Sequence, residues 1–434
     1  MNKKFLFVKT FGCQMNVYDS NRMVGALAVH GYEPTEAPEK ADVILLNTCH
    51  IREKASEKLF SEIGRLAKVR KKGSLIVVAG CVVQAEGKEI LRRSPLIDIA
   101  IGPQNYHQLP ELIAKYVRDQ GRVIQADFPA ESKFDNLPML KTSPANAFLA
   151  IQEGCDNFCS YCVVPYTRGC EYSRPSKEIL AEAKALVKAG AKEIMLLGQN
   201  VNCWHGDKGR DLGDLIRDVA KINGLERIRY TTSYPSKITQ NLINTHADTP
   251  KLMPYIHLPI QAGSDRILKA MNRQYTVAEY EKIIADFRSV RPDIAISSDF
   301  IVGFPGETEE DFEQTLAVVE RVQYASSFSF KFSARPGTPA SLMKNQIPEE
   351  VKTRRLMKLQ KLLQSQQRSF NESTVGKELD VLLTECGKMC GQLVGYTPYM
   401  QGTVVKAPKS QLGKIMRVKI IGASATALTG KILK

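Results

Sequence analysis

Residues 153–169, EGCDNFCSYCVVPYTRG, carry three cysteines at C-x3-C-x2-C spacing, Cys155, Cys159 and Cys162. Three thiolates at this spacing can hold three irons of a cubane 4Fe–4S cluster and leave the fourth iron without a protein ligand. An open iron is a place where chemistry can occur. The alternative is a structural zinc site completed by Cys170, but such sites usually combine paired C-x2-C elements from two loops. The spacing therefore favours an iron–sulfur cluster.

Strand-like apolar runs alternate with helical stretches from about Phe148 onward. Six runs indicate strands: AFLAIQEG, EIMLLGQNV, RIRYTTSYP, YIHLPIQAG, IAISSDFIVGFPG and ASSFSFKFSARPG. Six β-α units predict an α/β fold with a partial (β/α)6 barrel of parallel strands, which we assign to residues 146–370. Functional residues of such a barrel are expected at the carboxyl ends of its strands. The cysteine loop lies just after the first predicted strand.

The N-terminal residues 1–126 show the same alternation, and their continuous apolar runs, such as VILLN and LIVVAG, suit strands of a parallel sheet buried on both faces. Three of the runs end on a cysteine: Cys13, Cys49 and Cys81. A single cysteine in such a place is usually a small buried hydrophobe. Ligands of parallel α/β sheets, however, gather beyond the carboxyl ends of the strands. The predicted topology therefore brings three thiols to one edge of one sheet.

Two further segments complete the predicted domain organisation. Residues 127–145 are polar, aperiodic and contain proline, which indicates a linker. Residues 371–434 carry short β-like runs with glycine turns, which predict a small C-terminal β-barrel. This last segment has nine Lys and Arg against four Asp and Glu, a net charge of +5, which suits RNA binding.

The composition of the 434 residues narrows the functional class. The chain has a hydrophobic content of 43% and no run near the roughly 20 apolar residues that span a bilayer, so we expect a cytoplasmic protein with no membrane partner. Ten cysteines in a reducing compartment are better explained as metal ligands or buried thiols than as a disulfide framework. The net charge of +14 makes a polyanionic partner plausible, although many basic proteins merely have a solvated basic face.

The motifs resemble a known family over essentially the whole chain. With Tyr161 before its last cysteine, the loop resembles the signature of the radical S-adenosylmethionine superfamily. Together with the loop, the resemblance to the methylthiotransferases is carried, in order, by FGCQMN, NTCHIREKASEK, AGC, GQNVN, HLPIQAGSD, MNRQYT, DFIVGFPGET and SARPGTPA. Within that family, FGCQMN and NTCHIREKA resemble the branch of the tRNA-2-methylthio-N6-dimethylallyladenosine synthases.

This resemblance implies an architecture and a reaction. The architecture is an N-terminal methylthiotransferase domain, a radical barrel and a C-terminal RNA-binding barrel of the TRAM type. The reaction replaces the C2 hydrogen of an isopentenylated adenosine beside the tRNA anticodon with a methylthio group. It uses two molecules of S-adenosylmethionine, one as methyl donor and one cleaved to a 5′-deoxyadenosyl radical, and it needs a reducing electron-transfer partner. DNA is not an expected partner.

The resemblance also assigns cofactor ligands. It implies a second, auxiliary 4Fe–4S cluster on Cys13, Cys49 and Cys81, whose open iron holds the sulfur to be transferred. Cys155, Cys159 and Cys162 would hold the radical cluster, and no side chain is expected to act as an acid or base. S-adenosylmethionine would lie across the strand ends of the barrel, where the candidate contacts are Tyr161, Gly198, Gln199, Asn200, Ser233, Gln261, Ser264, Asp299 and Gly303. Polar residues at strand ends are also common turn residues, and Gly303 with Gly306 can simply form a turn.

Some residues and functions stay open at this stage. Tyr234 stands where the family usually has histidine, and Tyr396 where an arginine is common. The thiols outside the two sets, Cys170, Cys203, Cys386 and Cys390, are expected to be ordinary thiols. Within the family, the rival function is methylthiolation of threonylcarbamoyladenosine. From another class, the rival is a non-catalytic iron–sulfur redox sensor that binds RNA, although a sensor needs no barrel with an S-adenosylmethionine pocket.

Overall fold

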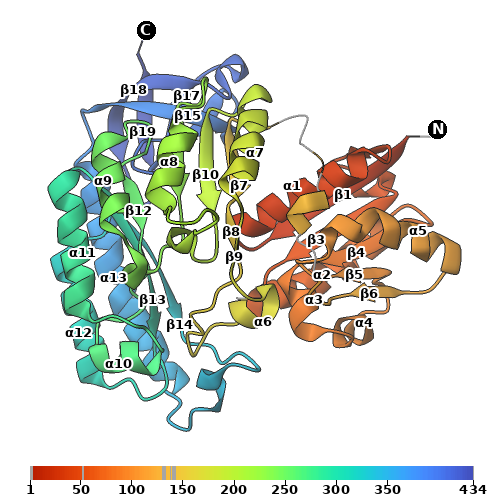
Figure 1. Cartoon of the computed structure of the whole chain (residues 1–434), viewed down its shortest axis with the longest axis horizontal. Helices are drawn as coiled ribbons and strands as arrows, with labels where there is room; N and C mark the ends of the chain where they lie inside the picture. The colour runs from red at the N-terminus through yellow and green to blue at the C-terminus, as the bar shows by residue number, and fades with distance from the viewer. Residues whose placement is uncertain (1–2, 51–52, 130–132, 137, 139–142, 434) are drawn as a thin grey trace. The chain divides into compact units, whose positions relative to one another are not determined.

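The computed structural model describes residues 3–50, 53–129, 133–136, 138 and 143–433. The chain forms two compact units (Figure 1). The first unit comprises Met1–Lys141, Glu153–Asp156 and Val163–Glu171. The second unit comprises Thr142–Gln152, Asn157–Cys162 and Tyr172–Lys434. The units are therefore not contiguous in sequence, and the cysteine loop divides between them, with Cys155 in the first and Cys159 and Cys162 in the second.

The first unit is built on a parallel sheet, as predicted, and the sheet has six strands in the order β2-β1-β3-β4-β5-β6. Its strands are β1 (Lys4–Phe11), β2 (Tyr32–Pro34), β3 (Val43–Thr48), β4 (Leu75–Ala79), β5 (Ile99–Ile101) and β6 (Val123–Gln125). Its main helices are α1 (Gln14–Ala28), α2 (Glu53–Val69), α3 (Cys81–Glu86), α4 (Glu89–Arg93) and α5 (Leu109–Asp119).

The central strands of this sheet are buried on both faces. In β3, Val43 and Leu45 pack into one hydrophobic cluster, whereas Ile44 and Leu46 pack into another. Successive side chains of a strand point to opposite faces, so the two clusters cover the two sides of the sheet. This explains the continuous apolar run VILLN, which a half-exposed strand would have interrupted with polar residues.

The second unit contains the predicted partial barrel of six parallel strands. They are β7 (Asn146–Ala150), β10 (Glu193–Leu197), β11 (Arg227–Tyr230), β12 (Tyr255–His257), β13 (Ala295–Val302) and β14 (Ser326–Lys331). They pair as two three-stranded sheets, β11-β10-β7 and β12-β13-β14, and a parallel bridge between Ile228 and Leu252 connects the two. The helices of the barrel are α7 (Ser176–Lys188), α8 (Leu212–Ala220), α9 (Gln240–Asp248), α10 (Asp265–Ala270), α11 (Val277–Val290) and α12 (Glu309–Val322).

A long helix, α13 (Glu349–Glu372), leads into a closed five-stranded barrel with strand order β15-β16-β17-β19-β18, and this confirms the predicted C-terminal fold. Its strands are β15 (Glu378–Cys386), β16 (Gln392–Tyr396), β17 (Gly402–Lys406), β18 (Ile415–Ala423) and β19 (Leu428–Ile432). Its core includes Val381, Leu393 and Val418.

Two buried arginines of β11 attach the C-terminal barrel to the (β/α)6 barrel. Arg227 donates hydrogen bonds to the backbone carbonyls of Tyr396 and Asp380, at 3.0 and 2.7 Å. Arg229 donates to Thr397 O at 2.7 Å and also to Glu193 at 2.9 Å. Because carbonyl oxygens accept these bonds, the attachment depends on the backbone of the C-terminal barrel.

Short elements complete the chain. Two short strands and one helix flank the cysteine loop: β8 (Gln152–Glu153), α6 (Val164–Arg168) and β9 (Tyr172–Ser173). Short 3-10 helices are formed by Pro38–Lys40, Tyr106–Gln108, Lys133–Asn136, Val201–Cys203, Pro235–Lys237, Pro339–Leu342 and Lys409–Gln411. The predicted linker, residues 127–145, lies partly outside the described residues. Among the helices that the structure describes, none is both long and apolar enough to cross a membrane.

Candidate functional site

Three cysteines lie at the carboxyl edge of the first unit's sheet. Cys13 precedes α1 just after β1, Cys49 directly follows β3, and Cys81 opens α3 after β4. These strands are parallel neighbours, so the sequence-distant thiols share one edge. Gly12 has a φ of +124°, and a Cβ there would lie 2.5 Å from the Cβ of Cys49. Only glycine allows the two cysteine-bearing strand ends to approach this closely.

The electrostatics of this edge differ from one thiol to the next. A hydrogen bond with Cys49, helped by the charge of Arg168 and by backbone amides, lowers the pKa of Cys13 to about 6 against the opposing effect of burial. For Cys81, burial raises the pKa of the thiol, and Arg168 opposes this through its charge and a hydrogen bond. Arg168 therefore acts on both thiols, and thiolate is the form that binds iron.

Arg168 belongs to a buried cluster of four charges, Asp19, Lys133, Glu153 and Arg168, which we call the N-terminal charge cluster. Arg168 pairs with Asp19 at 2.7 Å and with Glu153 at 2.5 Å. Lys133 pairs with Glu153 at 2.6 Å and lies 3.6 Å from Asp19. None of the four side chains is more than 3% exposed, so two acids balance two bases away from water.

The second unit's part of the cysteine loop is held by the last residue of α10 and by the residues that follow it. Ser160 donates from its backbone to Met271 O at 3.0 Å and from its hydroxyl to Ala270 O at 2.8 Å. The Asn272 amide donates to the carbonyls of Asn157 and Phe158, at 3.1 and 3.0 Å. These bonds fix the backbone on both sides of Cys159. In the first unit, Cys155 N donates to Gly169 O at 3.3 Å.

A buried arginine, Arg273, contacts the Cys159 thiol, with 3.6 Å between Nη1 and Sγ. Its Nε donates to the Tyr275 hydroxyl at 2.6 Å, and its Nη2 donates to Pro259 O at 2.7 Å. The guanidinium carbon also lies 4.3 Å from the ring centre of Tyr234 and 5.0 Å from that of Tyr275. The sequence showed Arg273 only as part of the motif MNRQYT, which gave no sign of its contact with a thiol.

Two predicted cofactor contacts at neighbouring strand ends carry polar atoms that have no partner among the described residues. Asn200, after β10, and Ser233, after β11, are both buried, and their Oδ1 and Oγ atoms make no hydrogen bond within the described residues. Nearby, a Cβ on Gly198 would lie 2.5 Å from Gln152 Oε1, which accepts from Asn200 N at 3.1 Å. Buried polar atoms are normally hydrogen-bonded, so these two fit a site for a polar ligand.

Other predicted contacts have different surroundings. Gln261 has a φ of +76°, and its backbone N donates to Asp299 O at 2.9 Å. The Asp299 carboxylate lies 3.5 Å from Nε2 of His257, a residue that the sequence reasoning did not single out although it opens the motif HLPIQAGSD. Tyr161 and Gln199 are half-buried, and burial raises the pKa of Tyr161.

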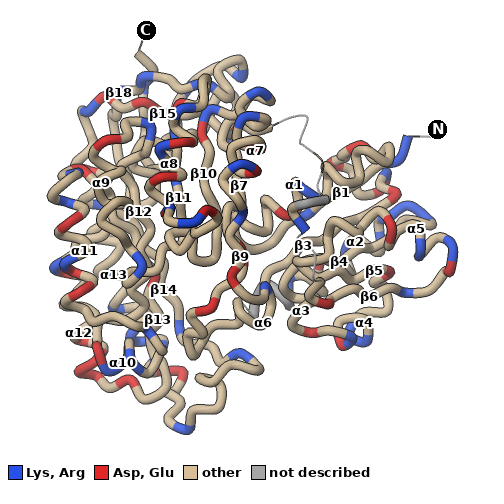
Figure 2. Tube along the Cα trace, viewed as in Figure 1, with Lys and Arg blue, Asp and Glu red and all other residues tan. Residues whose placement is uncertain are grey.

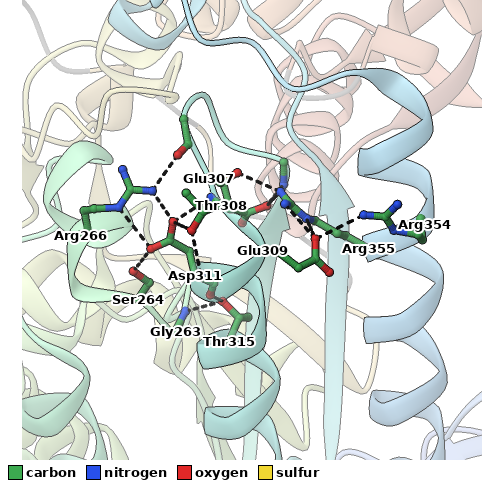
Figure 3. A network of polar contacts seen from close by, with 12 residues as sticks. Gly263, Ser264, Arg266, Glu307, Thr308, Glu309, Asp311, Thr315, Arg354 and Arg355 are labelled. Atoms are coloured by element: carbon green, nitrogen blue, oxygen red, sulfur yellow. Dashed lines mark hydrogen bonds and ion pairs between the residues drawn. The ribbon is translucent and has the colours of Figure 1, made fainter.

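Ser264 belongs to a polar network around α12, which Figure 3 shows, and Gly303 donates to Glu307 of the same network. The Ser264 hydroxyl donates to Asp311 at 2.6 Å, and Asp311 also caps α12 by accepting from Thr308 N. Gly303 N donates to Glu307 at 2.7 Å, and a Cβ on Gly303 would lie 2.1 Å from the side chain of Lys352. The Ser264 hydroxyl and the space beside Gly303 are thus both occupied by the protein itself.

Family models match three consecutive parts of the chain. The uncharacterized protein family UPF0004 matches residues 5–102, the radical SAM superfamily matches residues 149–319, and the TRAM domain matches residues 372–433. A tRNA-2-methylthio-N(6)-dimethylallyladenosine synthase of Maricaulis maris is 54% identical over 99% of this chain and 97% of its own length. One of Rickettsia rickettsii is 55% identical over the full length of both chains.

The chain belongs to this family of synthases. It is a tRNA methylthiotransferase with a radical SAM domain, as its motifs predicted. Among solved structures, the radical S-adenosylmethionine methyltransferase TsrM from Kitasatospora setae, with cobalamin and a 4Fe–4S cluster bound, has a TM-score of 0.61 at 13% identity, covering 79% of this chain and 77% of TsrM. At that identity the likeness concerns the fold alone. It agrees with the parallel-sheet unit and the partial barrel described above.

Membership in a radical SAM family implies a 4Fe–4S cluster and S-adenosylmethionine, and the thiols present suit such a cluster. In the part of this methylthiotransferase that the structure describes, no three His, Cys, Asp or Glu side chains gather as they would around one metal ion. A cubane cluster does not require its ligands to converge on one point, because each of its protein ligands binds a separate iron. Of the thiols outside the two sets, Cys203 accepts a hydrogen bond from Asn200 at 2.8 Å, and Cys170, Cys386 and Cys390 are exposed.

Proposed function

We propose that the chain replaces the C2 hydrogen of N6-isopentenyladenosine, adjacent to the tRNA anticodon, with a methylthio group, and that it uses two molecules of S-adenosylmethionine. The observation that carries this proposal is the presence of two sets of three cysteines in a chain of this family, one at the carboxyl edge of the first unit's sheet and one in the C-x3-C-x2-C loop. One set alone would supply radical chemistry without a second place to hold sulfur.

Each set would hold one cluster. Cys155, Cys159 and Cys162 would bind the radical cluster, which supplies the electron that cleaves S-adenosylmethionine, and an auxiliary cluster on Cys13, Cys49 and Cys81 would carry the sulfur. Around the second set, Gly12 permits the close approach of Cys49. The charge of Arg168 favours the thiolate form of Cys13 and Cys81.

The chain's own polar groups would bind and orient S-adenosylmethionine at the barrel strand ends. Asn200 Oδ1, which has no hydrogen-bond partner among the described residues, suits an ammonium donor, and the Ser233 hydroxyl suits a carboxylate or a ribose hydroxyl. Tyr161, Gly198, Gln199, Gln261 and Asp299 remain proposed contacts near the same ends. Ser264 and Gly303 are the weakest of the proposed set, because the Ser264 hydroxyl bonds Asp311 and Lys352 fills the space beside Gly303.

The C-terminal barrel would contact tRNA. Along β18, Arg417 and Lys419 are exposed and alternate with the buried Val418 and Ile420, which places basic side chains on the outer face of the barrel. Figure 2 marks the positions of lysine and arginine along the chain in blue. Phosphate contacts of this kind bind nucleic acid without reading its sequence. A one-electron donor would complete the system, and we place the enzyme in the cytoplasm, where thiols stay reduced.

Separating the two sets of cysteines tests the proposal. A chain with Cys13, Cys49 and Cys81 changed to alanine keeps the loop and the barrel, so under anaerobic reduction it should still cleave S-adenosylmethionine to 5′-deoxyadenosine and methionine. It should make no methylthiolated tRNA. Changing Cys155, Cys159 and Cys162 to alanine should abolish both products. Chromatography of the small molecules and mass spectrometry of the tRNA nucleosides read both outcomes.

Iron content gives an independent measurement. The anaerobically purified wild-type chain should carry about eight irons, and each triple variant should carry about half as many, because each cubane contributes four. Changing Cys386 and Cys390 to alanine is the matched control and should leave the iron content unchanged. Normal methylthio product from the Cys13, Cys49 and Cys81 variant would contradict the proposal, and so would zinc in place of iron in the wild-type chain.

A further inference from the structure

Arg273 is a buried cation for which the described residues provide no carboxylate. Its side chain makes the contacts given above: two tyrosine rings, the Tyr275 hydroxyl, the carbonyl of Pro259 and the Cys159 sulfur. The residue is 9% exposed. Rings and neutral oxygens solvate the guanidinium, but they do not neutralise its charge.

Burying a charge without a counter-charge costs free energy. Proteins therefore tend to bury a charged group only where a group of opposite charge lies against it. Of the groups that contact Arg273, only the Cys159 sulfur can become an anionic ligand of a cluster, because burial raises the pKa of the Tyr275 hydroxyl, which therefore stays neutral. A thiolate bound to an iron–sulfur cluster keeps negative charge on its sulfur. The missing partner of Arg273 is therefore supplied when Cys159 is a cluster ligand.

We propose that Arg273 is a positioning residue that holds the Cys159 sulfur and raises the reduction potential of the cluster on the C-x3-C-x2-C loop. The inference rests on the proposed function, because it takes Cys159 as a ligand. Reduction adds one electron to the cluster from an external one-electron donor, and no bond forms or breaks. The fixed positive charge favours the more negative, reduced state, since net charge and hydrogen bonds to the sulfurs set the potential of such clusters.

Tyr234 and Tyr275 hold the Arg273 guanidinium in a fixed place beside the Cys159 sulfur. The Tyr234 ring packs edge-on against the Tyr275 ring, with 5.7 Å between their centres, and the Tyr234 hydroxyl accepts from Gln274 N at 3.0 Å. The Tyr275 hydroxyl is in turn placed to donate to the carbonyl of Ile260, at 3.0 Å. Both rings are thus anchored to the backbone, and they keep water away from the guanidinium. A charge held in this way acts on its neighbours with little screening.

The test measures the potential of the loop cluster alone. In the full-length chain with Cys13, Cys49 and Cys81 changed to alanine, a redox titration with dithionite is followed by electron paramagnetic resonance without S-adenosylmethionine. In Arg273→Gln, the ratio of reduced to oxidised cluster at a fixed solution potential should fall at least about tenfold, which is about 59 mV for a one-electron couple. Arg273→Lys keeps the charge but loses the forked contacts, so its shift should be smaller and in the same direction.

Arg288→Met is the matched control, because Arg288 lies on α11 and donates to the carbonyl of Val322, so the potential should not change. An unchanged potential in an iron-replete Arg273→Gln chain would overturn the inference. If Arg273→Gln does not hold iron, the potential of Arg273→Lys is measured instead, and an unchanged potential in that variant would also overturn the inference. A change that appears only when S-adenosylmethionine is added would also overturn it. If the parent chain binds no iron at the loop, the proposed function fails instead.

Discussion

Two buried arginines act on cysteines that we propose as cluster ligands, and their surroundings differ in charge. Arg168 influences the pKa of Cys13 and of Cys81, and Arg273 contacts the Cys159 sulfur. Arg168 is paired with two carboxylates and shares them with Lys133, so the N-terminal charge cluster is neutral. Within the described residues, Arg273 meets tyrosines, a carbonyl and a thiol but no carboxylate. The first arginine is therefore balanced by carboxylates of the protein, whereas the second is balanced only when the Cys159 sulfur binds a cluster as a thiolate.

This difference indicates two separate roles for a buried arginine beside a thiol. A neutralised arginine can orient sulfur by hydrogen bonds while it adds little net charge. An arginine without a carboxylate exerts the field of a full charge, which shifts a redox equilibrium. The proposed auxiliary cluster would thus be positioned, and the proposed radical cluster would be made easier to reduce.

The largest expected effect is on stability, and it tests directly whether Arg168 and Arg273 differ in charge balance. In iron-free protein, Arg168→Met leaves Asp19 and Glu153 buried with only Lys133 between them, so the free energy of unfolding should fall by about 3–5 kcal/mol, as when a buried ion pair loses one partner. Arg273→Met removes a charge that no carboxylate of the described residues balances, so it should cost clearly less. Urea denaturation of both variants measures the two losses. Equal losses would show that the contrast in charge balance has no energetic consequence.

Another buried arginine, Arg355, extends the comparison because it pairs with two carboxylates at once. It donates to Glu307 at 2.8 Å and pairs with Glu309 at 3.1 Å (Figure 3). Burial, opposed by the Gly303 amide and Arg355, raises the pKa of Glu307 from about 4.5 to about 7. Here one arginine does not keep the more buried of its two carboxylates fully ionised.

The sign of the resulting pH dependence follows from proton binding. Between pH 4.5 and 7 the folded chain holds a proton on Glu307 that the unfolded chain releases, so stability falls as the pH rises through this window. At about 1.4 kcal/mol per pKa unit, the loss is about 3 kcal/mol. Urea denaturation at several pH values measures the free energy of unfolding of the wild type and of Glu307→Gln. The plot of this free energy against pH should be flatter for the variant. Identical curves would assign the dependence to other groups.

The fold and the placement of the thiols were readable from the sequence, because they depend on local pattern. Apolar runs such as VILLN indicate strands buried on both faces, and parallel strands bring their carboxyl ends to one edge. Cys13, Cys49 and Cys81 lie at that edge for this reason. The order of the β-α units likewise gave the partial barrel. These features need only neighbouring residues and general rules of chain topology.

The partners of the thiols were not readable, because tertiary contacts set them. Arg168 and Asp19 are 149 positions apart, and no local pattern links them. Lys133 lies in the segment predicted as a linker, where a buried lysine is unexpected. Ser264 was predicted as a cofactor contact because it follows a strand-like run, yet it precedes α10, and its hydroxyl bonds Asp311, 47 positions away. Sequence pattern located these residues near strand ends but could not tell which atoms their side chains meet.

Ser264 gives the next prediction, which separates a role in folding from one in cofactor binding. Because Ser264→Ala removes a buried hydrogen bond to a charged group, it should lower the free energy of unfolding by about 1.5–2 kcal/mol. The affinity for S-adenosylmethionine, measured by equilibrium dialysis under anaerobic conditions, should stay unchanged. Ser233→Ala is the matched variant, since its hydroxyl has no partner in the described residues, and it should weaken binding without a comparable loss of stability. The reverse pattern would support Ser264 as a contact of S-adenosylmethionine.

The smallest expected effect tests whether burial is what separates these arginines from ordinary ion pairs. Arg417 on β18 pairs with Glu378 at 3.6 Å and with Asp380 at 3.3 Å, and all three side chains are at least half exposed. Water and salt screen such pairs, and the entropy of the long side chains opposes them, so Arg417→Ala should change the free energy of unfolding by only about 0.5 kcal/mol. This change should shrink further in high salt, whereas the loss caused by Arg168→Met should persist, because buried pairs are screened much less. Urea denaturation of the two variants at low and high salt measures both responses. A loss for Arg417→Ala as large as that for Arg168→Met would show that the number of ion pairs, and not their burial, determines the contribution of these arginines.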